Sequence, residues 1–387
     1  MSEEAKPASP SADEPDLIAA APGLITIDLD ALASNYRFLR DRAAPAECAA
    51  VVKADAYGLG IAKVAPVLWR EGCHTFFVAT PQEAQVLRQL LPEAVIYVFD
   101  GLMPGTAPLF KAAGLRPVLN SLDEIREWAE FCHASGESLP AGIHIDSGMN
   151  RLGLPEAELD ALAQDRDGLK AFTLSLVMSH LACSDTPGHP KNEAQRARFA
   201  ELRKRLPEAP ASLANSGGVM LGTGYHFDQV RPGIALYGGQ PAGGDGHRFA
   251  NVVTVESRIL QIREAPAGDT IGYGATRLID KPARIATIAA GYADGISWVL
   301  SAGDGKPPLN AYLGPYPAPI MGRVSMDLIT LDVTGIPEEH AHRGALAQLI
   351  GPKVPLETIA QFASTVNYEI LTNLCRRAAR RYVGGDA

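Results

Sequence analysis

The sequence has few cysteines, no long hydrophobic run and no excess of positive charge. Its five cysteines include no C-x-x-C pair, so they suit reduced thiols in a cytoplasmic protein better than a disulfide or zinc framework. No apolar stretch reaches transmembrane length, and no basic region precedes an apolar one at the N-terminus. The net charge of -9 argues against nucleic acid or an anionic membrane as the main partner. We therefore expect a cytoplasmic protein that binds neither.

The chain of 387 residues is long enough for two domains. Residues 1–22 are rich in acidic residues, proline, serine and alanine, and this composition predicts a disordered tail. A glycine-rich stretch at 240–250 predicts a linker. These features predict a first domain over 23–245 and a second over 246–387.

Strand-like apolar segments alternate with helical patterns through the first domain. The strand candidates are 49–53, 74–79, 95–99, 116–119, 142–146, 174–179, 211–214 and 230–236. The helical patterns are 30–42, 61–71, 81–91, 121–135, 155–165 and 191–206. Eight strands with intervening helices predict an α/β fold, a (β/α)8 TIM-type barrel, with a doubly wound open sheet as the alternative. An earlier strand, 24–29, is surplus to the eight and is expected to pair outside the barrel.

The pattern after the linker is mostly β. Its strand candidates are 251–263, 283–290, 318–323 and 326–333, and two helices are predicted at 355–363 and 368–381. The last predicted helix is basic, with Arg376, Arg377, Arg380 and Arg381, and a solvated helix face accounts for these charges. The second domain is therefore predicted to be a mostly β module.

A barrel of this kind carries its reactive groups at the C-terminal ends of its strands. Lys53 is predicted to end the first strand, Asp146 follows the fifth and His180 ends the sixth. Asn215 follows the seventh strand, and Arg231 belongs to the eighth. We therefore expect polar groups from several strands to converge on one mouth.

Lys53 lies in the segment VVKADAYGLG, residues 51–60. An ammonium at the end of a buried strand is costly unless it is paired or neutralised. A neutralised lysine is a nucleophile that can react with an aldehyde. Tyr57 offers a hydroxyl from the same loop. Considered alone, such a lysine is more often a snorkelling side chain at a strand end.

Other candidates admit both a structural and a functional interpretation. Ser216 opens a helix after the seventh strand, while Gly233 and Ile234 follow the eighth. Free backbone N–H groups in these two loops would bind a phosphate. The alternative is that the glycines only form tight turns. Arg231 in an apolar strand needs an acceptor, either in a structural salt bridge or on a ligand.

His180 and Tyr273 are also ambiguous. No second histidine or cysteine lies at ligand spacing near His180, so we expect no metal. Tyr273 lies between two glycines that permit close backbone approach, and it could serve as an acid or base. Without further context it would be called a turn tyrosine.

Residues 51–60 closely resemble the pyridoxal-phosphate (PLP) attachment motif of alanine racemases. Further motifs occur in the order and approximate spacing of that family: DSGMNRLG (146–153), SHL (179–181), ANS (214–216), VRPGIALYG (230–238), IGYGAT (271–276), GYADG (291–295), GRVSMD (322–327) and NYEI (367–370). The resemblance extends over residues 23–383. It implies a homodimeric, PLP-dependent alanine racemase that interconverts L- and D-alanine and supplies D-alanine for peptidoglycan.

The resemblance also implies a role for each candidate residue. Lys53 carries PLP and acts as the base on one face of the substrate Cα, and Tyr273 from the partner subunit acts on the other face. Arg231 faces the pyridine nitrogen, and His180 is bonded to that arginine and to the tyrosine. The remaining cofactor residues are Tyr57, Arg151, Asn215, Ser216, Gly233, Ile234 and Tyr368. Substrate contacts are assigned to Arg151, Met326 and Tyr292.

The sequence departs from the family pattern at two places. His144 stands where many members carry a carbamylated lysine, so we expect no carbamate beside Arg151. The segment Ile296-Ser297-Trp298 replaces an aromatic residue, a proline and often an arginine, and this change bears on entrance geometry and selectivity.

Three alternative functions follow. A racemase of the same fold could act on serine or a broader set of amino acids. A fold-related PLP decarboxylase is disfavoured because Arg231 stands where such enzymes use an acid. A non-enzymatic PLP carrier is disfavoured by the residues after the linker, since such proteins resemble the barrel alone.

Overall fold

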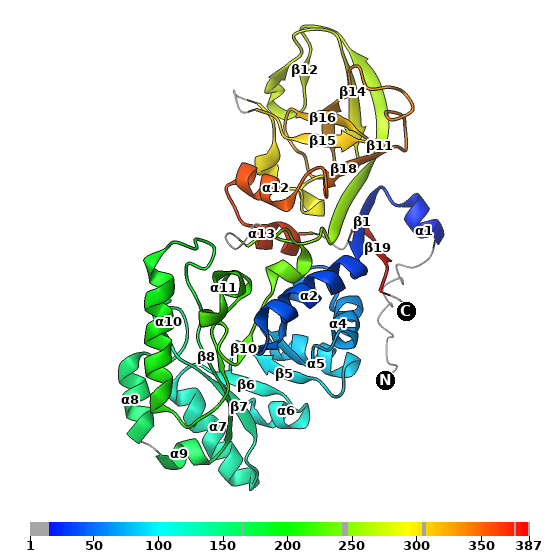
Figure 1. The fold of residues 1–387 in the computed structure, drawn as a ribbon. Coiled ribbons are helices and arrows are strands. Elements are labelled where there is room, and N and C mark those ends of the chain that lie inside the picture. Colours follow the sequence, from blue (N-terminus) through cyan, green and yellow to red (C-terminus); the bar gives the residue numbers. More distant parts are fainter. Residues whose placement is uncertain (1–14, 165, 242–246, 304–306, 375–376, 386–387) are drawn as a thin grey trace. The chain divides into compact units, whose positions relative to one another are not determined.

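The computed structural model describes residues 15–164, 166–241, 247–303, 307–374 and 377–385 (Figure 1). The chain divides into two compact units. We call residues 30–250 the barrel unit, and residues 1–29 together with 251–387 the β unit.

The barrel unit is built on a parallel sheet that closes on itself. Its strand order is β2 (Glu47–Cys48), β10 (Gln229–Val230), β9 (Ala211–Ser212), β8 (Thr173–Met178), β7 (Pro140–His144), β6 (Arg116–Leu119), β5 (Val95–Val98), β4 (Thr75–Val78) and β3 (Ala50–Val51). β2 and β3 are two pieces of one strand interrupted at Ala49. β2 pairs with β10 and β3 pairs with β4, so the two ends of the sheet meet. The predicted (β/α)8 barrel is confirmed.

Helices follow the strands around this barrel (Figure 1). They are α2 (Leu29–Ala43), α3 (Lys53–Tyr57), α4 (Ile61–Arg70), α5 (Pro81–Leu90), α6 (Ala107–Ala112), α7 (Leu122–Ser135), α8 (Glu156–Gln164), α9 (Arg166–Lys170), α10 (Pro190–Leu202) and α11 (Ser216–Leu221), with 3-10 turns η1 (Arg203–Arg205), η2 (Thr223–Tyr225) and η3 (Ile234–Tyr237). α5 and α7 begin at side-chain caps: Thr80 accepts from the Glu83 N–H, and Ser121 accepts from the Glu124 N–H. The sequence pattern had not predicted α6.

Aromatic rings fill the barrel interior. Phe77 of β4 stacks on Tyr97 and on Phe99, with ring centroids 5.0 Å apart in each pair. The Tyr97 hydroxyl lies 3.0 Å from the Ser175 hydroxyl of β8, three strands away in the sheet order. This packing gives the candidate site an apolar floor.

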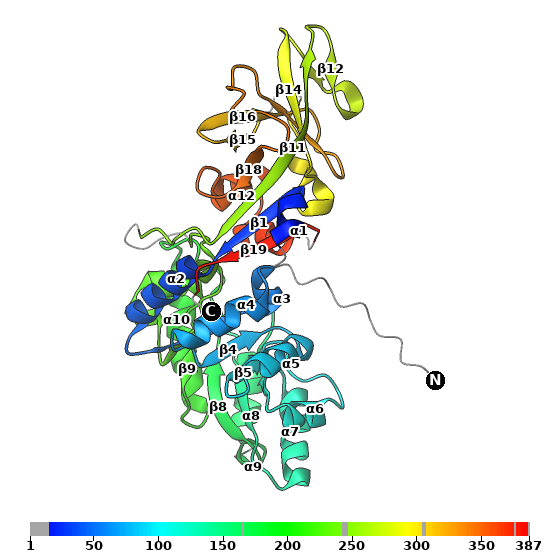
Figure 2. The same ribbon diagram turned by 90° about the vertical axis from the view of Figure 1, so that its right-hand side faces the viewer.

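The β unit contains a mixed sheet in the order β14 (Ala283–Ile288), β17 (Ile329–Asp332), β16 (Tyr316–Met321), β15 (Asn310–Leu313), β18 (Leu346–Ile350), β11 (Val253–Ala265), β1 (Gly23–Asp28) and β19 (Ala379–Val383). β1 lies between β11, which is antiparallel to it, and β19, which is parallel (Figure 2). The surplus strand at 24–29 therefore pairs outside the barrel, as expected.

The remaining elements of the β unit are α1 (Pro15–Ala20), the ribbon β12 (Thr270–Ile271) and β13 (Arg277–Leu278), the turns η4 (Tyr273–Ala275), η5 (Tyr292–Asp294) and η6 (Trp298–Leu300), and the helices α12 (Leu356–Ala363) and α13 (Asn367–Thr372). In the described part of the chain no helix is long and apolar enough to cross a membrane. The described cysteines Cys48, Cys73, Cys132 and Cys183 are free thiols.

Three predicted elements need correction. Of the predicted disordered tail, residues 1–14 lie outside the described range, but Pro15–Ala20 forms α1, which lies beside β19. The predicted helix 368–381 ends at Thr372, and Ala379–Val383 forms β19 because β1 supplies a strand for it to pair with. The predicted strand 230–236 is short, since Pro232 has no N–H to continue the ladder and Ile234–Tyr237 forms a 3-10 turn.

Candidate active site

Lys53 opens a left-handed turn just after the first barrel strand. β3 ends at Val51, so the prediction that Lys53 ends the strand is two residues out. Four successive residues without a glycine, 54–57, have φ between 54° and 56°. Each such residue costs roughly 1–2 kcal/mol in this conformation. A turn of this kind persists only where its surroundings fix it, and such turns are typical of functional sites.

The Lys53 amine is partly buried at the C-terminal ends of the barrel strands, the space we call the mouth. Its Nζ lies 5.8 Å from the centroid of the Phe99 ring. Burial lowers the pKa of Lys53, as does the charge of Arg151, while Glu83 and Asp100 act in the opposite direction. The net lowering of the pKa raises the fraction of neutral amine, which is the nucleophilic form.

Arg231 is a buried cation at the same mouth, only 2% exposed. Its Nη1 donates to the Ser212 hydroxyl at 2.5 Å and its Nη2 to the Ser179 carbonyl at 2.7 Å. Burial lowers the pKa of Arg231 to about 9, which leaves it charged at neutral pH. Among the described residues no carboxylate forms an ion pair with it, so the structural salt bridge is not found. The guanidinium can therefore donate to an acceptor on a ligand.

Two histidines near Arg231 are held neutral. Burial lowers the pKa of His144 to about 4, and the positive charge of Arg231 adds to the effect. Asn120 donates both amide hydrogens, to the carbonyls of Val118 and Phe99, so its Oδ1 accepts from His144 Nδ1 at 2.8 Å. His144 is thereby fixed with its proton on Nδ1 and a lone pair on Nε2.

The pKa of His180 is lowered well below its usual value, chiefly by burial. The titratable neighbours that also lower it are Arg231, Arg151, His144 and Lys53. These groups come from four strand ends, those of β3, β7, β8 and β10, so the predicted convergence of polar groups at one mouth is observed.

A second cluster at the mouth has the form of an anion cradle. The Ser216 hydroxyl accepts from the N–H groups of Gly233 at 2.9 Å and Ala235 at 3.2 Å, and it joins the loops after β9 and β10. Asn215 caps α11 by accepting from the Gly218 N–H at 2.9 Å. A Cβ at Gly233 would lie 2.2 Å from the Tyr57 hydroxyl. The cap uses the Gly218 N–H, while the N–H groups of Ser216 and Gly217, the first two of α11, precede any acceptor within the helix and could face a phosphate.

Arg151 ends a loop that Asp146 organises. The Asp146 carboxylate accepts from the N–H groups of Gly148, Met149 and Asn150 at 2.8 to 3.1 Å. Asp146 is therefore a loop-forming residue, and the exposed Arg151 side chain follows it. The charge of Arg151 lowers the pKa values of Lys53 and of both buried histidines, so it acts on the same mouth.

The other predicted site residues lie in the β unit and are exposed: Tyr273, Tyr292, Met326 and Tyr368. Tyr273 is 73% exposed in the loop closed by β12 and β13. The segments of Tyr292 and Met326 are joined directly, because the Tyr292 N–H donates to Ser325 and the Ala293 N–H donates to Met326. Tyr368 lies on α13.

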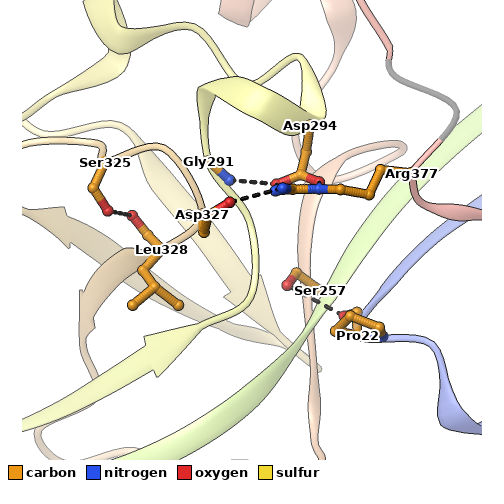
Figure 3. Close-up of polar contacts among 8 residues, drawn as sticks. All are labelled: Pro22, Ser257, Gly291, Asp294, Ser325, Asp327, Leu328 and Arg377. Atoms are coloured by element: carbon orange, nitrogen blue, oxygen red, sulfur yellow. Dashed lines mark hydrogen bonds and ion pairs between the residues drawn. The ribbon is translucent and has the colours of Figure 1, made fainter.

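Arg377 fastens this pair of segments together (Figure 3). Its guanidinium donates to both carboxylate oxygens of Asp294 at 2.8 Å and to Asp327 at 2.7 Å. Asp294 in turn accepts from the Gly291 N–H at 2.9 Å. The interpretation of Arg377 as a charge on a solvated helix face is wrong. Arg376 lies outside the described residues.

Comparison with known proteins agrees with this arrangement. The family model for the alanine racemase N-terminal domain matches residues 27–241, and the model for the C-terminal domain matches residues 252–382. The chain belongs to the alanine racemase family. It is 50% identical to an alanine racemase of Methylobacterium nodulans over 94% of this chain and 96% of that one, and 46% identical to that of Brucella canis over 96% of each.

Solved structures of the family have the same fold. An alanine racemase from Bartonella henselae with covalently bound pyridoxal phosphate has a TM-score of 0.89 and 39% identity, over 94% of this chain and 100% of that one. The biosynthetic alanine racemase of Pseudomonas aeruginosa has a TM-score of 0.84 and 32% identity, with the same coverage.

The mouth fits a phosphorylated pyridine aldehyde. It offers an amine of lowered pKa, an anion cradle in which a Cβ at Gly233 would collide with Tyr57, and a buried guanidinium with unused donor capacity. Among the described residues no group of three histidine, cysteine or acidic side chains is placed to hold a metal ion.

Sequence reasoning missed several residues that hold the site. Glu83 contacts the turn after Lys53, Asn120 fixes the His144 tautomer, and Ser212 receives Arg231. Glu83 had a sequence signal, the Thr-x-x-Glu capping pattern starting at Thr80, which indicates a helix start but not the second contact. Asn120 and Ser212 had no sequence signal, because their partners lie on other strands.

Proposed function

We propose that the protein is a PLP-dependent alanine racemase, an isomerase that interconverts L- and D-alanine. The observation that carries the proposal is a partly buried amine of lowered pKa, Lys53, at the same mouth as an anion cradle and a buried arginine. We further propose that it works in the cytoplasm and supplies D-alanine for peptidoglycan.

Lys53 would hold PLP covalently, and the phosphate would lie against Tyr57, Ser216, Gly233 and Ile234, with Tyr368 also assigned to it. When bound, PLP withdraws electrons from the substrate and so acidifies its Cα proton. Arg231 would donate to the pyridine nitrogen. Since a guanidinium stays charged, it would leave that nitrogen unprotonated and limit electron withdrawal.

Racemisation requires a proton to leave one face of Cα and another to arrive on the opposite face. Lys53 Nζ would serve one face and the Tyr273 hydroxyl the other, with His180 bonded to Arg231 and oriented toward the tyrosine. Arg151, Met326 and Tyr292 would contact the substrate, with the Met326 backbone at its carboxylate, and Arg151 would also lie near the phenolic oxygen of the cofactor.

We propose a homodimer in which Tyr273 reaches the partner's site. Supporting this, Tyr273 is one of the residues that line an open hollow of about 580 Å³ in the β unit. Exposed apolar side chains border it, including Leu260 at 44% and Leu328 at 40% exposure. Exposed apolar surface of this kind is typical of a protein interface.

The alternative is a racemase with serine or broader specificity, raised by residues 296–298. Ile296 is buried at 4% exposure, so it belongs to the core of the β unit, whereas Trp298 is 53% exposed. Trp298 is therefore the residue of this segment to vary. Turnover over a panel of L-amino acids decides between the two functions, and alanine ranking low would favour the alternative.

The holoenzyme of Tyr273→Phe tests the two-base proposal. We expect racemisation to fall by about 10²-fold or more in both directions while PLP content stays unchanged. In D2O the variant should still exchange the Cα hydrogen of the one enantiomer that Lys53 serves, without inversion. Tyr312→Phe, in β15, is the control. Unchanged racemisation in Tyr273→Phe would rule out its role, and borohydride labelling of the wild-type enzyme at any residue other than Lys53 would refute the cofactor assignment.

A further inference from the structure

The left-handed turn after Lys53 is fastened from outside by one carboxylate. Glu83 Oε1 accepts from the Ala54 N–H at 2.7 Å, and Oε2 accepts from the Ala79 N–H at 2.8 Å and the Thr80 N–H at 3.4 Å. Ala54 directly follows Lys53, and Ala79 directly follows β4. The side chain therefore spans the loops after two neighbouring barrel strands.

Helix capping explains only part of this arrangement. A capping box needs the Thr80 hydroxyl to accept from the Glu83 N–H and the carboxylate to accept from the Thr80 N–H, and both bonds are present. The short bonds to Ala54 and Ala79 are additional. The bond to Ala54 crosses 29 residues of sequence and begins inside the strained turn.

The turn has internal supports, but these do not orient it relative to the barrel. The Ala56 N–H donates to Val52, the Gly58 N–H donates to Ala54, and the Ile61 N–H donates to the Asp55 carboxylate. All of these bonds join residues within 52–61. Outside the turn, Tyr57 packs against Tyr237 with ring centroids 4.7 Å apart, and Glu83 joins the turn by hydrogen bonds to the loop after β4.

We propose that Glu83 is a positioning residue for Lys53. It holds the left-handed turn in the orientation that brings the Lys53 amine into the mouth at the level of the anion cradle. This rests on the proposed role of Lys53 as the PLP-bearing residue. A charge-assisted bond to a backbone N–H is stronger than a neutral one, so a carboxylate suits this task better than an amide.

Two other effects of Glu83 must be separated from positioning. Its charge acts on Lys53, where it opposes burial and Arg151, and Asp100 acts in the same direction. None of the described hydrogen bonds joins the Asp100 side chain to the turn, so Asp100 shares the charge effect without the contact. Thr80 takes part with Glu83 in the capping box of α5 but carries no charge. The chain therefore offers a matched control for each effect.

The experiment compares Glu83→Gln, Glu83→Asp, Asp100→Asn and Thr80→Ala with the wild-type holoenzyme. The readouts are the Kd for PLP, the visible circular dichroism of bound PLP, the pH profile of kcat/KM and Tm. A glutamine presents one NH2 group to a backbone N–H, and an aspartate is too short to span both loops. We expect both Glu83 variants to raise the Kd for PLP at least tenfold and to change the visible circular dichroism.

The controls should behave differently. Asp100→Asn should shift the pH profile with PLP affinity unchanged, and Thr80→Ala should lower Tm alone. Glu83→Asp should keep the wild-type pH profile, since it keeps the charge. The positioning role is wrong if Glu83→Gln only shifts the pH profile, as expected for Asp100→Asn, or only lowers Tm, as expected for Thr80→Ala. Failure of wild-type Lys53 to be labelled by borohydride after PLP loading would instead overturn the proposed function.

Discussion

His144 makes the stability of this protein depend on pH in a way that can be calculated. In the folded chain its pKa is about 4, against the ordinary value of 6.5, because the ring is buried beside Arg231. Between these values the unfolded chain binds a proton that the folded chain does not. The contribution of neutral His144 to the unfolding free energy is therefore complete above pH 6.5 and is lost as the pH falls from 6.5 toward 4.

The expected loss follows from the two pKa values. At pH 5 the unfolded histidine is almost fully protonated and the folded one is almost fully neutral, which costs about 2 kcal/mol of unfolding free energy relative to pH 7.5. His180 contributes in the same direction, so the wild-type change should be larger. Comparison with a His144 variant isolates the share of this one residue.

Urea unfolding of the holoenzyme at pH 5.0 and pH 7.5 measures this share. We expect His144→Gln to be less stable than wild type at pH 7.5, because the bond with Asn120 is altered, but to lose about 2 kcal/mol less on acidification. His133→Gln, at an exposed position in the last turn of α7, should retain the wild-type pH dependence. Equal losses for wild type and His144→Gln would refute the claim that His144 is held neutral.

Two further predictions concern the loops that carry the site. Arg377→Met should raise KM for alanine about tenfold, because Asp294 and Asp327 lose their shared partner, with a small change in Tm, because solvent screens the exposed guanidinium. Steady-state kinetics and melting curves measure both, and an unchanged KM would contradict the role of Arg377 in joining the two segments. Gly233→Ala should weaken PLP binding at least tenfold, because the new Cβ would meet the Tyr57 hydroxyl at 2.2 Å; PLP titration followed by absorbance measures it, and wild-type affinity would show that the two groups are not in contact.

The barrel could be predicted from the sequence because its signal is local. Buried strands such as β4 are short continuous apolar runs, and the helices between them have caps such as Thr80 and Ser121. Reactive groups at strand ends followed from the barrel geometry. Lys53, His180 and Arg231 therefore meet at one mouth as expected.

The features that were missed depend on distant partners. The segment Ala379–Val383 is a strand only because β1 lies beside it, and its arginines gave no indication of that pairing. The left-handed turn after Lys53 contains no glycine at 54–57, so the local sequence carried no signal for a left-handed conformation. Asn120 and Ser212 acquire their roles from side chains that only the closed barrel brings near.

The position of β1 has a consequence for how the protein can be made. Because synthesis runs from the N-terminus, Gly23–Asp28 leaves the ribosome long before either of its neighbours, β11 and β19. One edge of β1 therefore stays unpaired until β11 has emerged, and the other edge until β19 has emerged. A gene fragment beginning at residue 251 would encode a sheet with a gap between β11 and β19, so the β unit cannot be obtained whole by expressing the C-terminal half alone.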